Sequence, residues 1–230
     1  MKTLGLIGGM SWESTVIYYQ HMNRMVRSQL GGLHSARLLL WSFDFQEIEK
    51  DQASGDWEAA SGKMCDAAKR LKAAGADAIV ICTNTMHKMA DQVEAASGLP
   101  LIHIADTTAK AIKRKGLSKV GLLATRYTME EDFYKGRLIE KHGLEVVIPN
   151  EENRAIVHDI IYNELCQGII KNSSKENYKI VIQSLINQGA EGIVLGCTEI
   201  GLLIKQQDVA APVFDTTLIH AQEAIAFSLG

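Results

Sequence analysis

Two segments of the sequence end an apolar run in residues that could transfer protons. The segment "IVICTNTMH" (79–87) carries Cys82 and Thr83 side by side, and "IVLGCTEIG" (193–201) carries Cys197. A thiol with an ordinary pKa of about 8.5 can act as acid or base near neutral pH, whereas a threonine hydroxyl is a far weaker acid. Neighbouring side chains on extended backbone point in opposite directions, so only one of Cys82 and Thr83 can face a given pocket.

The elements that must position these residues follow an alternating pattern. Short runs rich in Ile, Val and Leu, "TLGLIGG" (3–9), "ADAIVICTN" (76–84) and "LPLIHIAD" (99–106), are separated by longer charged stretches. The stretch "EAASGKMCDAAKRLKAAG" (58–75) has apolar residues at helical spacing. Continuous apolar strands that alternate with amphipathic helices predict a mainly parallel sheet covered on both faces.

The second half of the chain repeats this pattern. "KVGLLAT" (119–125) resembles "TLGLIGG", "QGAEGIVLGCTE" (188–199) resembles "AGADAIVICTNT", and "APVFDTT" (211–217) resembles "LPLIHIADTT". The last match sets Asp106-Thr107-Thr108 against Asp215-Thr216-Thr217. We therefore expect an α/β fold of two similar lobes, each a mainly parallel sheet flanked by helices.

We place the lobe boundaries at 1–113 and 114–230, and allow for the C-terminal helix to pack back on the first lobe. Ligands of open parallel sheets bind beyond the carboxyl ends of the strands. Two facing lobes would therefore line a cleft with matching loops, 8–12 with 124–128 and 82–87 with 196–200.

The register of the repeat bears on the choice between Cys82 and Thr83. A gapless alignment sets Ile79 against Ile193 at an offset of 114 residues, and the same offset sets Thr83 against Cys197. Matching Cys82 to Cys197 needs a slip of one residue, which would reverse the side chains that face the cleft. The register favours Thr83 and interprets Cys82 as a small core residue, although Cys82 as the base stays an open alternative.

The chain resembles the aspartate/glutamate racemases along nearly its whole length. The motifs that carry the resemblance are "LGLIGGMSWEST" (4–15), "GADAIVICTNTMH" (75–87), "GLLATRYTM" (121–129) and "GAEGIVLGCTEIG" (189–201). The resemblance implies cofactor-independent racemisation by two opposed residues, usually two cysteines, in a cleft between the lobes. The sequence keeps the second cysteine at Cys197 and has Thr83 where the first belongs.

Racemisation without pyridoxal needs a base on one face of the α-carbon and an acid on the other. The resemblance implies that Cys197 serves the α-proton of the L enantiomer, which leaves the D side to Thr83. Each unit of pKa mismatch costs about 1.4 kcal/mol, so we expect a slow enzyme that is kinetically biased toward the L enantiomer.

The carbanion is stabilised when fixed donors hold the α-carboxylate. The donors that the resemblance assigns to the substrate are side chains and loop N–H groups at Met10, Ser11, Asn84, Thr85, Thr125 and Thr198. For the distal carboxylate we favour Gln52 as a neutral donor over Lys50. Cys166 stands where aspartate racemases often carry a lysine, so aspartate, glutamate and another substrate all stay open.

Composition restricts the other classes of function. The formal net charge of −3 argues weakly against nucleic acid or an anionic membrane as a partner, and no apolar run is long enough to span a membrane. The four cysteines show neither zinc spacing nor disulfide density, and "GLIGGM" lacks a dinucleotide fingerprint. We expect a cytoplasmic enzyme that uses no cofactor or metal and acts on a small acidic amino acid.

Further interpretations concern the assembly of the protein, two alternative functions and two histidines. The resemblance implies a homodimer. A decarboxylase or isomerase of the same superfamily would need a single thiol, and a non-catalytic amino-acid binding protein would need none. His87 and His220 are interpreted as structural residues.

Overall fold

The computed structural model describes residues 1–230, which form two compact units. Unit 1 comprises Met1–His103 and His220–Gly230, and unit 2 comprises Ile104–Ile219. The boundary expected from the sequence lies between residues 113 and 114. Helix α5 (Ile104–Arg114) belongs to unit 2 because its apolar face is part of the core of that unit.

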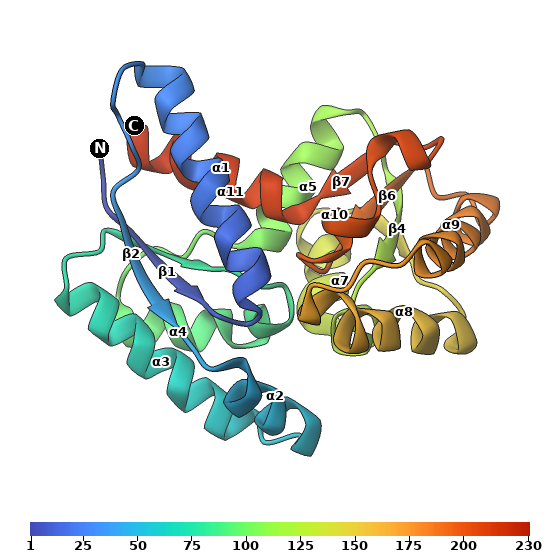
Figure 1. Cartoon of the computed structure of the whole chain (residues 1–230), viewed down its shortest axis with the longest axis horizontal. Helices are drawn as coiled ribbons and strands as arrows, with labels where there is room; N and C mark the ends of the chain where they lie inside the picture. Colours follow the sequence, from blue (N-terminus) through green and yellow to red (C-terminus); the bar gives the residue numbers. More distant parts are fainter. The chain divides into compact units, whose positions relative to one another are not determined.

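Unit 1 contains a three-stranded parallel sheet of order β2-β1-β3 (Figure 1). Its strands are β1 (Leu4–Gly8), β2 (Leu38–Ser42) and β3 (Ala78–Ile81). Its helices are α1 (Trp12–Leu30), α2 (Phe45–Ser54), α3 (Trp57–Ala73) and α4 (Ala90–Ser97), with a 3₁₀ helix over Thr85–Met89. The last helix, α11 (Thr216–Leu229), begins in unit 2 and ends in unit 1.

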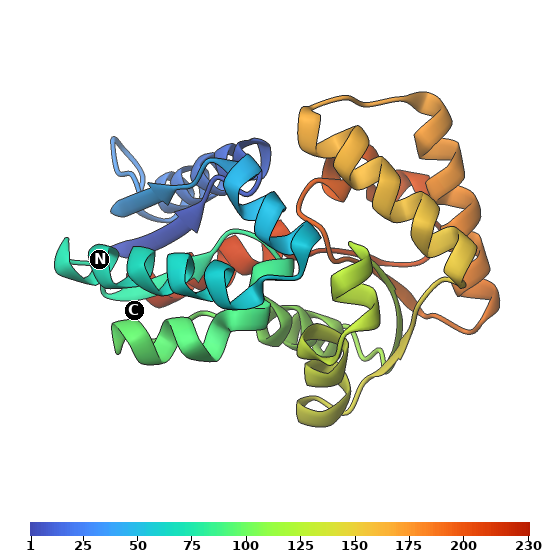
Figure 2. The same cartoon turned by 90° about the horizontal axis from the view of Figure 1, so that it is seen from below.

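Helices cover both faces of the unit 1 sheet. Leu6, Val80 and Cys82 pack in one apolar cluster with residues of α1 and α11. Ile7 and Ile79 pack in another cluster with residues of α3 and α4, and Figure 2 shows these two helices running beside each other. This alternation confirms the parallel sheet covered on both faces that the apolar runs predicted.

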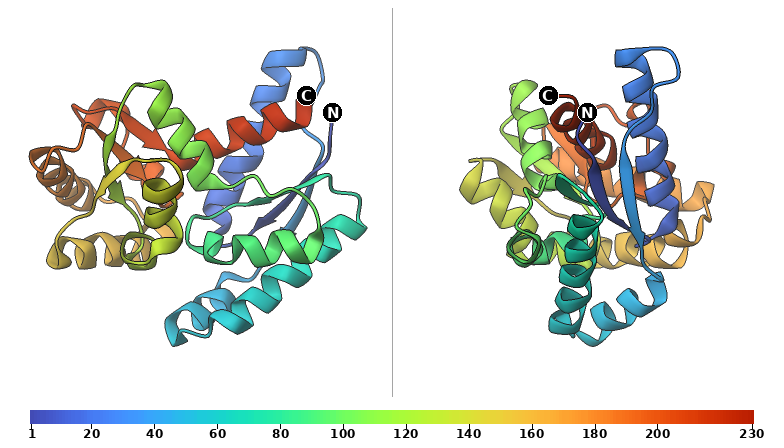
Figure 3. Two further views of the ribbon diagram at one scale, coloured as in Figure 1. Left: turned by 180° about the vertical axis from the view of Figure 1, so that it is seen from behind. Right: turned by 90° about the vertical axis from the view of Figure 1, so that its left-hand side faces the viewer.

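The two termini of the chain meet on unit 1, as Figure 3 shows. The Lys2 N–H donates to the Ser228 carbonyl oxygen at 2.8 Å, and the Ser228 hydroxyl donates to the Lys2 carbonyl oxygen at 2.6 Å. The C-terminal end of α11 is therefore tied to the residues that lead into β1.

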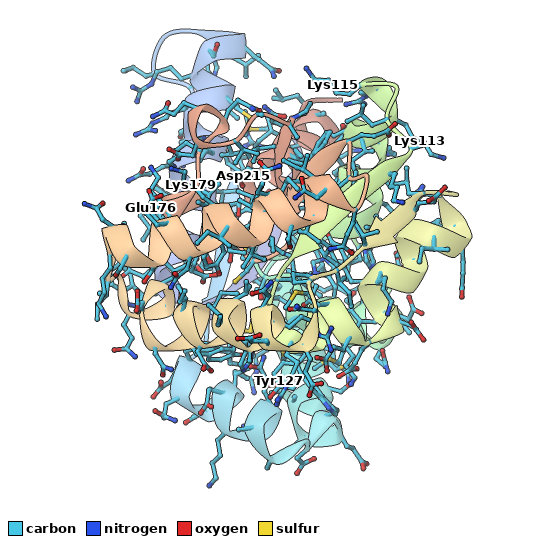
Figure 4. All side chains as sticks on the ribbon, turned by 90° about the vertical axis from the view of Figure 1, so that its right-hand side faces the viewer. Lys113, Lys115, Tyr127, Glu176, Lys179 and Asp215 are labelled. Carbon is cyan, nitrogen blue, oxygen red and sulfur yellow. The ribbon has the colours of Figure 1, made fainter.

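Unit 2 contains a four-stranded parallel sheet of order β5-β4-β6-β7. Its strands are β4 (Lys119–Leu123), β5 (Glu145–Val147), β6 (Gly192–Leu195) and β7 (Val213–Asp215). Besides α5, its helices are α6 (Arg126–Glu130), α7 (Asp132–Gly136), α8 (Glu151–Asn163), α9 (Asn172–Asn187) and α10 (Ile200–Leu203), with short 3₁₀ or π segments at 137–141, 165–167 and 206–208. The outer face of α9 carries an ion pair between Glu176 and Lys179 (Figure 4).

The two units repeat one strand order, as the sequence predicted. The fourth strand of unit 1 is reduced to a single bridge between Ile79 and Leu101. The predicted strand over 99–106 is therefore wrong beyond this bridge, since α5 begins at Ile104. The hydroxyls of Thr107 and Thr108 both donate to the Ile104 carbonyl oxygen, a local bonding pattern that suits a first helical turn.

The match of Asp106-Thr107-Thr108 to Asp215-Thr216-Thr217 is also wrong. The Ile79 N–H donates to the Pro100 carbonyl oxygen, and the equivalent Ile193 N–H donates to the Pro212 carbonyl oxygen. Pro100 and Pro212 are therefore counterparts, which sets the offset between the two units at 112 residues in this segment. His103 is consequently the counterpart of Asp215, and the sequence match was shifted by three residues. Neither unit contains a helix long and apolar enough to cross a membrane.

Candidate active site

Equivalent backbone hydrogen bonds fix the register of the two strand ends that carry the candidate catalytic residues. In unit 1 the Cys82 N–H donates to the Ile7 carbonyl oxygen at 2.9 Å. In unit 2 the Gly196 N–H donates to the Leu123 carbonyl oxygen at 2.7 Å. Cys82 is thus the structural counterpart of Gly196, and the next residue, Thr83, is the counterpart of Cys197.

Cys82 belongs to the core of unit 1. Its side chain is 1% exposed and lies in the cluster that contains Leu6, Val80 and Tyr18. Burial raises the pKa of the Cys82 thiol well above its ordinary value. A thiol that is buried among apolar side chains and strongly disfavoured as a thiolate is a poor proton-transfer group.

Thr83 begins the turn that follows β3. The residue is 9% exposed, and its carbonyl oxygen lies 2.7 Å from His87 Nδ1. Asn84 and Thr85 follow in the same turn, both buried, and Thr85 opens the 3₁₀ helix. The structure thus brings these three candidates together at the carboxyl end of β3.

Met10 and Ser11 lie at the carboxyl end of β1, the strand that pairs with β3. The Gly9 N–H donates to the Thr15 hydroxyl at 2.9 Å, and that hydroxyl donates to the Ser11 carbonyl oxygen at 3.0 Å. Gly9 has a φ of 83°, and a β-carbon there would collide with the backbone of Phe43. Glycine is required here because only it combines this backbone conformation with so close an approach.

Gln52 lies on α2 and contacts the turn that follows β3. Its side chain is 4% exposed, and its Nε2 donates to Met86 Sδ at 3.0 Å. Met86 directly follows Thr85, so the amide of Gln52 is held beside the residues that follow β3. Lys50, the alternative to Gln52, is exposed.

Cys197 and Glu199 form a buried pair at the carboxyl end of β6. Cys197 Sγ donates to Glu199 Oε2 at 2.9 Å, and the Thr198 hydroxyl donates to the same oxygen at 2.9 Å. Burial, the negative charge of Glu199 and the nearby Cys166 together raise the pKa of the Cys197 thiol well above its ordinary value. The resting group is therefore a thiol with its proton directed at a carboxylate.

Sequence reasoning did not select Glu199. The signal was present, because Glu199 is the one acidic residue in the otherwise apolar and small segment "IVLGCTEIG", and it is 2% exposed. A buried acidic residue usually requires partners, and here the partners are the candidate residues Cys197 and Thr198.

Thr125 stands at the carboxyl end of β4, which pairs with β6. It is the N-cap of α6, where its hydroxyl accepts a hydrogen bond from the Thr128 N–H at 3.4 Å. The adjacent Arg126 N–H donates to His158 Nδ1 of α8, and burial lowers the pKa of His158. The strand ends of unit 2 thus bring Thr125 near Cys197 and Thr198.

Two residues near the end of α8 complete the surroundings of Cys197. Burial and then the charge of Cys197 raise the pKa of Tyr162, while burial and the charge of Glu199 raise that of Cys166. Both side chains pack against the core of unit 2. No group of three or more His, Cys, Asp or Glu side chains in the chain is arranged to hold a metal ion.

The repeated sheet order and the proton-transfer groups at matching strand ends define a two-lobed α/β protein suited to acid–base chemistry on a small molecule. Residues 7–224 match the family described as "Asp/Glu/Hydantoin racemase". The chain belongs to this family, and its fold is that of the Asp/Glu racemases.

Similar proteins support this assignment. A protein of known structure from Yersinia pestis, assigned as an Asp/Glu racemase, is 59% identical over the whole of both chains, with a TM-score of 0.93. An aspartate racemase homologue from Pyrococcus horikoshii OT3 is 37% identical over the whole of both chains, with a TM-score of 0.85. The broad specificity amino-acid racemase RacX of Bacillus subtilis (strain 168) is 24% identical over 166 residues, which cover 71% of this chain and 70% of RacX.

Proposed function

We propose that this racemase interconverts the enantiomers of aspartate, glutamate or both by removing and returning the α-proton without pyridoxal phosphate. The observation that carries the proposal is the pair of equivalent backbone hydrogen bonds that makes Thr83 the counterpart of Cys197. Membership of the racemase family supports the reaction class. The similarity to an aspartate racemase homologue supports an acidic substrate.

On the L side, Cys197 is the group that exchanges a proton with the α-carbon. Its thiol already donates to Glu199, so the carboxylate has the geometry to accept that proton. The resulting thiolate takes the α-proton of the L enantiomer, and in the reverse direction the thiol returns it. The ammonium group of a bound amino acid favours the thiolate through its positive charge.

On the D side, Thr83 or a water held by its hydroxyl exchanges the proton. Because a hydroxyl is a far weaker acid than a thiol, this half-reaction is the slow one. The equilibrium constant between enantiomers is one, so kcat/KM for net inversion is equal in both directions. The bias therefore appears in kcat and KM separately and in one-sided exchange of the α-hydrogen with solvent.

The α-carboxylate is bound by donors at the carboxyl ends of strands, and stabilisation of the carbanion depends on these donors. The proposed donors are Met10, Ser11, Asn84, Thr85, Thr125 and Thr198. Gln52, which already contacts the turn after β3 through Met86, is proposed to bind the distal carboxylate.

Exchange of the α-hydrogen in heavy water, followed by NMR with L- and D-aspartate and L- and D-glutamate, tests the proposal. We expect L substrate to exchange faster than it inverts. Cys197→Ser should abolish exchange from the L enantiomer, Thr83→Cys should accelerate exchange from the D enantiomer, and Cys82→Ala should change neither. Burial of Cys82 in the core is the reason for the last expectation.

Each contrary result has a distinct meaning. Equal exchange from both enantiomers contradicts the role of Thr83. Loss of exchange in Cys82→Ala but not in Thr83→Ala contradicts the register. Release of CO₂ from a disubstituted malonate, without racemisation, favours the single-thiol decarboxylase, and stereospecific binding without any exchange favours a binding protein.

Homodimerisation and a cytoplasmic location complete the proposal, both supported by resemblance to the family. Sedimentation equilibrium of the purified chain would measure the first. A single species at the mass of one chain would contradict it.

A further inference from the structure

Three histidines and Tyr18 form a buried cluster in unit 1 that the proposed proton transfers do not use. His87, His103 and His220 are 2%, 7% and 0% exposed. The ring of His87 lies 4.7 Å from that of His103 and 5.6 Å from that of His220, measured between centroids. The cluster directly adjoins the turn after β3, because His87 contacts Thr83.

Hydrogen bonds determine where the protons of this cluster lie. His220 Nε2 is 2.6 Å from the Ile102 carbonyl oxygen, so Nε2 carries a hydrogen and donates it. His220 Nδ1 then accepts from the Tyr18 hydroxyl at 2.8 Å. By the same reasoning His87 Nδ1 carries a hydrogen and donates it to the Thr83 carbonyl oxygen.

Unit 2 has different residues at the positions that correspond to His87 and His103. By the register of the repeat, Gly201 is the counterpart of His87 and Asp215 is the counterpart of His103. A β-carbon on Gly201 would lie 2.5 Å from Asp215 Oδ2, so these two positions are adjacent in unit 2 as well. At these two positions, imidazoles therefore occur only in unit 1, where Thr83 begins the turn, while the thiol of unit 2 pairs with Glu199.

We propose that His87 is a positioning residue for Thr83, an inference that rests on the proposed function. At this strand end the Cys82 N–H makes a sheet hydrogen bond to Ile7, and the carbonyl oxygen of the next residue, Thr83, is held by His87. That bond fixes the peptide that follows Thr83, and with it the direction of the Thr83 side chain. A weak acid tolerates misalignment poorly, and a shift of about 1 Å can cost about a hundredfold in rate.

Two amide substitutions separate positioning from packing. The side-chain nitrogen of Asn overlaps the place of His Nδ1, whereas that of Gln overlaps Nε2. His87→Asn therefore retains the donor to Thr83, and His87→Gln removes it. His34, an exposed histidine, provides the matched control as His34→Gln.

Exchange of the α-hydrogen is measured from each enantiomer of aspartate and glutamate, with the native protein and in a Thr83→Cys background where D-side exchange is faster. We expect His87→Gln to lower D-side exchange by about tenfold or more while L-side exchange at Cys197 stays within about twofold. His87→Asn should restore most of the D-side rate, and His34→Gln should match its parent.

Other outcomes overturn the inference. An equal loss from both enantiomers would show that His87 only stabilises the fold, and an equal loss in His87→Asn and His87→Gln would exclude the bond to Thr83. A native protein that exchanges neither enantiomer of either amino acid would refute the proposed function and the inference together. If the native protein exchanges the α-hydrogen but the His87 variants lose D-side and L-side exchange equally, the inference is refuted and the proposed function is not.

Discussion

The thiol of Cys197 is held in surroundings that oppose its ionisation. It is buried, and its nearest polar partner is the carboxylate of Glu199 at 2.9 Å. A carboxylate this close raises the cost of a second negative charge while it also accepts the thiol proton. In the proposed mechanism, Glu199 thus suppresses the thiolate before substrate binds and takes the thiol proton when a substrate cation is bound.

The substitution Glu199→Gln separates these two effects. Removing the negative charge should lower the pKa of the Cys197 thiol toward its ordinary value, since Glu199 contributes to raising it. The rate of alkylation of Cys197 by iodoacetamide, measured against pH, should therefore rise at lower pH in the variant. Racemisation should fall by about a hundredfold, a typical effect of losing a proton-transfer group.

Glu191→Gln is the control, because Glu191 is exposed and caps the backbone at Ser118 and Lys119. An unchanged alkylation profile in Glu199→Gln would contradict the coupling between Glu199 and Cys197. Faster racemisation would contradict the role of Glu199 as proton acceptor.

At the scale of the elements, Asp106 connects α5 to the segment that follows α7. Its carboxylate accepts from Arg137 Nε and Nη2, Lys141 Nζ and His142 Nε2, at 2.7–2.8 Å. Partial burial raises the pKa of Asp106, but the hydrogen bonds from Arg137, His142 and Lys141 outweigh this and hold it well below its ordinary value. One side chain thus ties two elements 31–36 residues apart in sequence.

We expect Asp106→Asn to lower the free energy of unfolding by about 1–3 kcal/mol at pH 7, since hydrogen bonds to a charged group are lost. A carboxyl with a lowered pKa in the folded state stabilises the fold above its unfolded pKa of about 3.9 and loses this contribution as the pH falls below that value. The difference between native protein and variant in urea unfolding should therefore be largest near neutral pH and shrink in acid.

Asp66→Asn is the matched control, because the pair of Asp66 with Arg70 on α3 is exposed. Its removal should change the free energy of unfolding by less than about 1 kcal/mol. Equal effects of the two substitutions would contradict the structural role of Asp106.

The elements differ in how well the sequence predicts them. Strands β1, β3, β4 and β6 are almost entirely buried on both faces, which gives continuous apolar runs. The edge strand β2 is largely half-buried or exposed, and β5 spans only Glu145–Val147, so neither shows such a run. The run at 99–106 contains a bridge and the start of a helix, and short apolar runs do not distinguish these states.

The same limit applies to the candidate site. The register of Thr83 and Cys197 was predictable because the two segments align without a gap, at one offset of 114 residues from Ile79 and Ile193 to Thr83 and Cys197. The histidine cluster was not, since contacts such as Tyr18 with His220 join residues about two hundred positions apart. No local pattern encodes such a contact.

At the scale of the whole molecule, the last residues of the chain are part of unit 1 although α11 begins in unit 2. Ala221, Ala224 and Ile225 pack in the cluster that covers β1 and β3. His220 leads this segment and is bonded to Tyr18 of α1 and to the Ile102 carbonyl oxygen. The neutral imidazole of His220 therefore joins three distant parts of the chain through hydrogen bonds: α11, α1 and the segment that contains Ile102.

The protonation of His220 should make the stability of the fold depend on pH. Burial lowers the pKa of His220 to about 4, whereas an unfolded histidine has a pKa of about 6.5. Between these values the unfolded state binds more protons, so the free energy of unfolding should fall as the pH falls, by up to about 3 kcal/mol from this group. His220→Gln retains the donor to the Ile102 carbonyl oxygen but does not titrate. Urea unfolding from pH 7 to pH 4.5 should therefore show a steeper loss of stability in the native protein than in His220→Gln, because the other histidines contribute equally to both. Parallel pH profiles would mean that His220 is accessible to protons in the folded state, contrary to its burial and to both of its hydrogen bonds.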